Sequence, residues 1–186
     1  MVDTATISIA QDIYDAIEHG IDTSGNIVGA DDTPDKGGVE DGEDFYTVNN
    51  QGSGTEMNVW CFQLAKPEKE DEPLLPVALI NMQANTPSEQ TLDNGIRGVT
   101  IEVQFQVNEF EGQVSIGDTT YKMSQALQIF RERLIDLLRN MRFRSVLPTS
   151  RPFVEPTEID NGSSDNGFIV FGGATLSLDY MESITD

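Results

Sequence analysis

The longest helical pattern in the chain covers residues 118–144, and it limits the possible folds more than any other stretch. Its apolar side chains recur at steps of three and four residues, which places them on one face of a helix. This stripe consists of Met123, Leu127, Phe130, Leu134, Leu137 and Met141, widened by Ala126 and Leu138. Asp118, Thr119 and Thr120 provide candidate N-cap oxygens. We therefore expect a long amphipathic helix that packs through this face.

The polar side of the same helix is basic, although the chain as a whole is strongly acidic. Six of the 11 basic residues fall between residues 122 and 144, against two acids, so this stretch carries +4. The whole chain carries −21, which leaves −25 for the rest. The six are Lys122, Arg131, Arg133, Arg139, Arg142 and Arg144. Such a helix has an expected partner in acidic surface, either on this subunit or on another one.

Two interpretations of this basic face remain open. The first is a solvated face with ion pairs inside the chain. The second is a subunit contact, because helical projection groups Arg131, Ile135, Arg139 and Arg142 on one flank of the apolar stripe. A flank of mixed isoleucine and arginine is typical of interfaces, since arginine tolerates partial burial beside carboxylates better than lysine does. We take these four residues as the candidate interface.

Composition restricts the class of protein. With 186 residues, 38% of them hydrophobic, the chain suits a single domain, residues 1–186. No apolar run is long enough to span a bilayer, and the N-terminus lacks a signal-peptide pattern. We expect a protein without membrane contact. The single cysteine, Cys61, excludes an intrachain disulfide and is expected to be a buried structural thiol.

The charge of −21 has three candidate explanations: mimicry of a nucleic acid, calcium binding, or a host cytoplasm of high salt. The 32 acidic residues are spread along nearly the whole chain, which favours the third. At about 1 M salt the Debye length is only about 3 Å, so self-repulsion nearly vanishes. We therefore expect a halophilic, archaeal setting.

The remaining patterns indicate an α+β fold. Residues 6–19 form an amphipathic pattern that ends at Gly20, so a short N-terminal helix is expected. The cleanest strand is 98–108, in which five apolar residues alternate with five polar ones. Further strands are expected at 56–64, 74–82, 110–116 and 168–181. This order predicts a mostly antiparallel β-sheet with the long amphipathic helix and the short N-terminal helix packed on one face.

Two stretches look irregular. Residues 22–54 combine seven glycines with many acids, so we expect a mobile acidic insertion. Residues 145–167 contain Pro148, Pro152, Pro156 and the run DNGSSDNG, which predicts a proline- and glycine-rich loop.

No catalytic constellation is evident in the sequence. It contains no Gly-x-Ser-x-Gly motif, no phosphate loop, no dinucleotide fingerprint and no His/Cys metal spacing. The only histidine, His19, stands at the end of the first helix, and Lys36 occupies the glycine position of a calcium loop that would begin at Asp31. We expect no enzyme activity, no cofactor and no metal site.

The order of these elements resembles that of the tail terminator, or tail completion, proteins of long-tailed double-stranded DNA viruses. In that family a helix begins the chain, an alternating strand leads into a long amphipathic helix, and a late strand ends in a pattern like G-x-L-x-L-x-Y. Here the late pattern is carried by Gly173, Leu176, Leu178 and Tyr180, with Ala174 and Thr175 widening the first gap. The resemblance is one of layout and covers most of the chain apart from the loops.

The resemblance implies a structural virion protein. Family members form a homo-hexameric ring that caps the tail tube, contacts the tube protein and presents a surface to the neck or head-completion protein. DNA would pass through the lumen without specific binding, which acidic walls would favour. The implied location is the tail or neck of a virion assembled in the host cytoplasm. Two alternatives stay open: another ring-forming neck, head-completion or tube protein, and a non-viral acidic binding module of a halophile.

Overall fold

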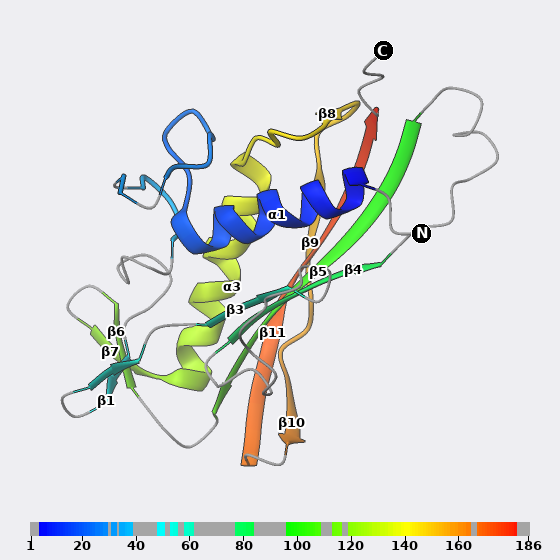
Figure 1. Ribbon diagram of the computed structural model, residues 1–186. Helices are drawn as coiled ribbons and strands as arrows, with labels where there is room; N and C mark the ends of the chain where they lie inside the picture. Colours follow the sequence, from blue (N-terminus) through cyan, green and yellow to red (C-terminus); the bar gives the residue numbers. More distant parts are fainter. Residues whose placement is uncertain are drawn as a thin grey trace.

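Within the residues that it describes, the computed structural model has two helices, α1 and α3, and two β-sheets (Figure 1). The helices are α1 (Thr4–His19) and α3 (Met123–Asn140). The mostly antiparallel arrangement with helices confirms the expected α+β fold. The structure describes residues 4–29, 31–32, 34–38, 48–50, 53–55, 58–61, 77–83, 96–108, 113–116, 119–164 and 167–181.

The larger sheet is built around two long strands, β5 (Ile96–Asn108) and β11 (Gly167–Met181). These two pair antiparallel without interruption, from Ile169 opposite Asn108 to Met181 opposite Ile96. The sheet continues through β4 (Val77–Gln83), which is antiparallel to β5, to β3 (Asn58–Cys61), which is parallel to β4. On the other side, β11 pairs with β8 (Leu147–Pro148), β9 (Phe153–Pro156) and β10 (Asp160–Ser164).

The alternation predicted for residues 98–108 is confirmed. Its five apolar side chains are buried, while Thr100, Glu102, Gln104 and Gln106 are half-buried. The register places Ala174, Leu176 and Leu178 of β11 beside the buried row of β5. We call this buried side the inner face of the sheet and the opposite side the outer face.

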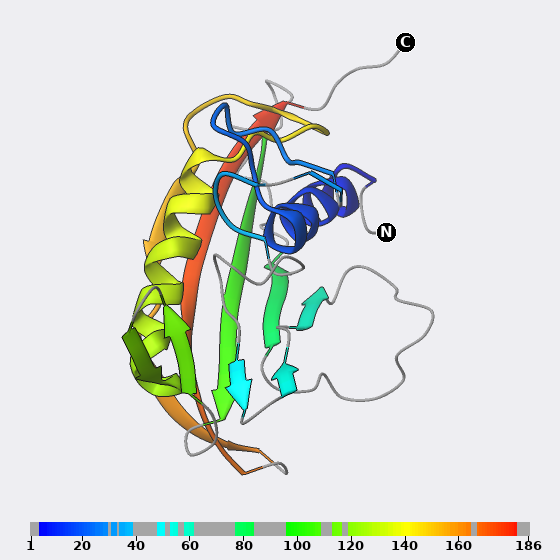
Figure 2. The same ribbon diagram turned by 90° about the vertical axis from the view of Figure 1, so that its left-hand side faces the viewer.

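Both helices cover the inner face, as predicted (Figure 2). α3 lies over β5 and β11, with the rings of Phe105 and Phe130 meeting edge to face at 6.3 Å and 64°. α1 lies over β3 and β4, and the side chains that share its apolar face are fully buried: Ile9, Ile13, Ala16 and Ile17. Cys61 lies buried in the same core, as expected of a structural thiol.

The smaller sheet is formed by two hairpin pairs and has the order β2-β1-β6-β7 (lower left in Figure 1). Its strands are β1 (Val48–Asn50), β2 (Ser53–Thr55), β6 (Gln113–Ile116) and β7 (Thr119–Lys122). β7 corrects the predicted start of the long helix. Thr119 and Thr120 extend this hairpin as strand residues, so the helix begins only at Met123, after the N-cap Lys122. Asp118 lies outside the described residues.

The stretch 145–167, predicted as a loop, contains β8, β9 and β10, and that prediction was wrong in this respect. Its prolines misled the sequence argument, because a proline is compatible with a strand at the edge of a sheet, where no partner needs its N–H. Pro148 and Pro156 occupy such positions opposite β11.

The segment after α1 folds back on the helices in its described part. Gly20 ends α1 with φ 85° and its N–H donates to the carbonyl of Ala16, as expected of a glycine at a helix end. Ile21 then bridges both Ile27 and Lys36. Residues 30, 33, 39–47 and 51–52 of the predicted mobile insertion lie outside the described residues, so its mobility stays a prediction.

Candidate functional site

The flank predicted as an interface lies over the β9 edge of the large sheet. Arg131 donates from Nη1 to the carbonyl of Thr157 at 2.8 Å and from Nη2 to Oε1 of Gln128 at 2.6 Å. Eight residues further along α3, Arg139 donates from Nη2 to the carbonyl of Val154 at 3.1 Å. Ile135 is half-buried between them and packs against the core. These three residues are therefore brought together, and both arginines bind backbone oxygens of their own chain.

These contacts close the open side of β9. A strand at the edge of a sheet presents unpaired backbone groups that attract other strands. Here Arg139 covers the carbonyl of Val154, and Pro156 has no N–H to offer. Beyond β9, Thr157 binds Gly173 twice: its N–H donates to the Gly173 carbonyl at 2.9 Å, and its Oγ1 accepts from the Gly173 N–H at 2.7 Å. The arginine flank thus protects an edge strand.

The fourth predicted member, Arg142, does not share this flank. α3 ends at Asn140, and Met141 is already extended, so helical projection no longer applies beyond that point. The N–H of Arg142 donates to the carbonyl of Gly25 at 2.8 Å, and its side chain is exposed. The grouping of all four residues on one flank was wrong for Arg142, because the helix is shorter than its apolar pattern.

The last basic residue of the segment is held by acids, in agreement with the ion-pair interpretation. The carboxylate of Asp12, whose side chain is 4% exposed, accepts from the backbone N–H and the Nε of Arg144, both at 2.9 Å. It also accepts from the N–H of Ser145 at 3.1 Å and from its hydroxyl at 2.7 Å. Arg144 further binds Asp15. Burial alone would lower the pKa of Arg144, but the hydrogen bonds and charges of Asp15 and Asp12 outweigh it and raise that pKa.

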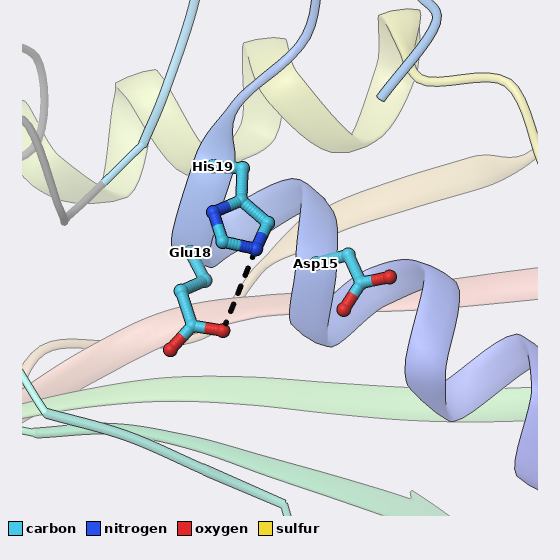
Figure 3. A group of neighbouring side chains, drawn as sticks. All are labelled: Asp15, Glu18 and His19. Atoms are coloured by element: carbon cyan, nitrogen blue, oxygen red, sulfur yellow. Dashed lines mark ion pairs between the residues drawn. The ribbon is translucent and has the colours of Figure 1, made fainter. Parts of the chain in front are cut away.

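Asp15, Glu18 and His19 form a cluster with the ligand types of a metal site (Figure 3). One ligand atom of each lies within 4.8 Å of the others, and His19 Nε2 is 3.8 Å from the Glu18 carboxylate. Asp15 already accepts from Gln11 and binds Arg144, while Glu18 accepts from the Tyr14 hydroxyl. A cation would have to displace Arg144 from Asp15, so the geometry favours a helix terminus stabilised by ion pairs.

An exposed apolar surface on the outer face was not foreseen from the sequence. Leu147 of β8 is 67% exposed, and it stands directly opposite Met181 of β11, which is 43% exposed and stands opposite Ile96 of β5. Further along the same face, Phe153 of β9 is 60% exposed and stands opposite Ser177. We call Leu147, Phe153 and Met181 the outer strip. Only the pairing of β8 and β9 with β11 brings these residues together, and no pattern in the sequence indicated that pairing.

Acidic side chains accompany the outer strip. Asp179 of β11 lies on the same face between the Met181 and Ser177 rows, beside Gly98 of β5. Glu155 of β9 stands opposite Thr175 one row beyond Phe153. Both acids are exposed. The strip therefore has one acid between its two apolar rows and another beside Phe153 at one end.

Comparison with known proteins adds no family to this description. No known protein-family model matches the chain, and no curated protein matches it in sequence. Among the residues that the structure describes, no helix has both the length and the apolar content that crossing a bilayer requires.

Proposed function

We propose that this chain is a tail terminator of a long-tailed double-stranded DNA virus, a structural rather than catalytic component of the virion. In this function six copies form a ring on the finished tail tube, stop its growth and contact the neck or head-completion protein. The chain would act in the tail or neck of the particle, after assembly in the host cytoplasm. DNA would pass through the ring without sequence-specific contact.

The observation that carries this proposal is the outer strip. Large exposed apolar side chains in register on one sheet face indicate a protein contact, because water-exposed apolar patches are unfavourable for a monomer. The exposed apolar side chains of the outer strip contrast with the rest of the surface, because the chain carries 32 acidic residues. A subunit of a larger assembly has a reason to keep such a face.

The layout supports the same proposal. The four elements on which the resemblance rests occur in the expected order as α1, β5, α3 and β11. At Gly173, the first residue of the late pattern, β11 lies very close to β5, since a Cβ added there would lie 1.9 Å from the carbonyl oxygen of Val103. The pattern ending in Tyr180 thus belongs to an interior strand of the sheet, between β5 and the edge strands.

Electron microscopy of the purified chain, alone and mixed with tail tubes from the same virus, tests the function. We expect sixfold rings at one end of the tubes and tubes that no longer elongate when tube protein is added. Tubes that incorporate the chain along their length would indicate a tube protein instead. A chain that ignores tubes and binds only to the portal end of capsids would indicate a neck or head-completion protein, and one that binds neither would remove the virion assignment.

We further propose that the host is a halophilic archaeon, because six copies would carry six times −21, or −126 formal charges, in one ring. At about 0.01 M salt the Debye length is about 30 Å and neighbouring subunits repel each other, whereas at about 1 M it is about 3 Å. We expect the melting temperature and the sedimentation coefficient to rise steeply with potassium chloride. A response to millimolar calcium that a chelator reverses, with no response to monovalent salt, would overturn the halophilic assignment.

A further inference from the structure

We propose that the outer strip binds the C-terminal part of α3 on a second copy of this chain, in a head-to-tail contact that repeats around the ring. This inference rests on the proposed function, because it assigns the surfaces through which such a ring would close. The two surfaces are the outer strip, with Asp179 between its two apolar rows and Glu155 at one end, and a basic surface formed by Arg139 in the last turn of α3 and Arg142 just beyond the helix.

Charge identifies a second copy as the partner. Two outer strips facing each other would bring Asp179 and Glu155 of both copies together, which like-charge repulsion disfavours. The acids at the strip require a positive surface instead. Residues 122–144 carry +4, while the rest of the chain carries −25. The complementary surface therefore lies on or beside α3.

The contacts inside the subunit show which bases are left for a neighbour. Arg144 is held by Asp12 and Asp15, and half-buried Arg131 donates from Nη1 to Thr157 and from Nη2 to Gln128. Arg139 is exposed and its described bond to Val154 uses Nη2, which leaves other guanidinium donors for a second acceptor. Arg142 is exposed and contacts Gly25 through its backbone, so its side chain can pair with a neighbour.

The two surfaces belong to different layers of the subunit. The outer strip lies on the sheet face that points away from the helices, and α3 lies in the helix layer (Figure 2). One subunit can therefore use both surfaces at once, with a different neighbour on each. A contact between unlike surfaces closes into a ring when the rotation between copies allows it, whereas a contact between identical surfaces stops at a dimer.

Two complementary variants test the assignment. The strip variant combines Leu147→Ser with Met181→Ser, and the basic-surface variant is Arg142→Glu, alone or with Arg139→Glu. Self-association is measured by sedimentation at about 1 M potassium chloride. This salt concentration screens the repulsion between the acidic chains in the wild type and in the variants alike. We expect the Kd of self-association to rise by about 10-fold to 100-fold in the strip variant, and by a smaller factor of about 3-fold to 10-fold in the basic-surface variant, because the salt screens its charges. Circular dichroism should match the wild type, since the changed side chains are exposed.

Mixing the variants distinguishes head-to-tail contact from any other. The strip variant keeps an intact basic surface and the basic-surface variant keeps an intact strip, so the mixture should form a heterodimer that grows no further. Phe168→Ser is the matched control, because Phe168 is 58% exposed but lies at the opposite end of β11, and this variant should assemble normally. The single change Arg142→Glu keeps the test decisive if Arg139→Glu disturbs the β9 edge.

Three results would overturn the inference: variants that assemble as the wild type does, a mixture that stays monomeric, or a wild-type chain that stays monomeric at high concentration in high salt. Adding tail tubes to the wild type and to the variants distinguishes an error in the assigned surfaces from an error in the proposed function. Tubes capped equally by the wild type and both variants would preserve the function and remove the assigned surfaces. Rings that obey the mixing test but ignore tubes would preserve the surfaces and remove the tail-terminator function.

Discussion

The basic segment uses arginine in one way within α3 and in another way beyond the helix. Beyond the helix, Arg144 meets two carboxylates of α1, one of them buried, and joins the first helix to the segment after α3. Within α3, Arg131 and Arg139 bind the carbonyls of Thr157 and Val154, and neither meets a carboxylate among the residues that the structure describes. Arg144 therefore holds the fold together through charge, and the two helical arginines complete the hydrogen bonding of a sheet edge.

This difference shows that net charge does not identify the partner of a cation. In a chain of −21 the expected partner of this basic helix was acidic surface, on its own subunit or another. Two of its arginines satisfy backbone oxygens instead, because an edge strand offers accessible carbonyls that also favour a cationic donor. The cations that remain for other molecules are fewer than the count of six suggests.

The largest effect is expected from removing the buried carboxylate that holds Arg144. Asp12→Ala would leave Arg144 and Ser145 with four donors deprived of their acceptor. We expect the free energy of unfolding to fall by about 3–5 kcal/mol, measured by urea titration at high salt. Asp15→Ala is the control: Asp15 is more exposed and Arg144 keeps Asp12, so the loss should be clearly smaller. Equal losses would contradict the role of Asp12.

A smaller effect is expected at the sheet edge. Replacing Arg131 and Arg139 together by alanine removes hydrogen bonds to carbonyls that water can reach, so we expect a loss of about 1–2 kcal/mol. The uncovered β9 edge should also promote aggregation at high protein concentration, measured by light scattering. Arg142→Ala should change the free energy of unfolding by no more than about 0.5 kcal/mol, as other surface changes do, and should leave the light scattering unchanged. If the double variant behaves like Arg142→Ala, the edge needs no cover.

Proteolysis sharpens the prediction that residues 22–54 are mobile. A glutamate-specific protease has sites at Glu40 and Glu43 within this segment, and at Glu158 within residues 145–167, whereas the Glu155–Pro156 bond resists cleavage. We expect the first two to be cut earlier, because Glu158 lies between β9 and β10, which both pair with β11. Mass spectrometry of the first fragments decides the order, and initial cuts confined to Glu158 would contradict the prediction.

The smallest expected effect is the response of one turn to acid. Hydrogen bonds from the side chain and backbone of Asn26 lower the pKa of Asp22, supported by the backbones of Ser24 and Gly25. Because the folded pKa is lowered, this contribution is present above the usual aspartate pKa and is lost as the pH falls through the lower value. NMR of the Asn26 amide should therefore follow a transition below the usual aspartate range in the wild type. Asp22→Asn should abolish it, and an unchanged transition would assign it to another group.

The sequence predicted the elements whose side chains repeat regularly. The rows in β5, β11, α1 and α3 are buried on the faces expected from their periods, because apolar periodicity reports burial directly. The predicted boundary of the long helix was wrong because two structures suit the same residues: Thr119 and Thr120 can cap a helix or extend a hairpin. The short edge strands were not predicted because their prolines were taken as evidence against a strand, although an edge strand tolerates proline.

The candidate site was predictable only in part. Helical projection correctly grouped Arg131, Ile135 and Arg139, since these lie within the regular part of α3. The identity of their partners depends on β9, which was not foreseen, and Arg142 fell outside the projection. The outer strip joins β8, β9 and β11, so it depends on pairings between distant parts of the chain that periodicity does not encode.

The uninterrupted pairing of β5 with β11 also dictates the order in which the molecule can be built during synthesis. β5 emerges well before β11, and until then one whole side of this long strand has no partner. Asp12 is likewise synthesised long before its partner Arg144, which is 132 residues away in the chain. Contacts so distant along the chain make folding slow and leave an unpaired strand edge open to misassembly in the meantime. A newly made chain is thus most in need of a chaperone between the synthesis of β5 and that of β11.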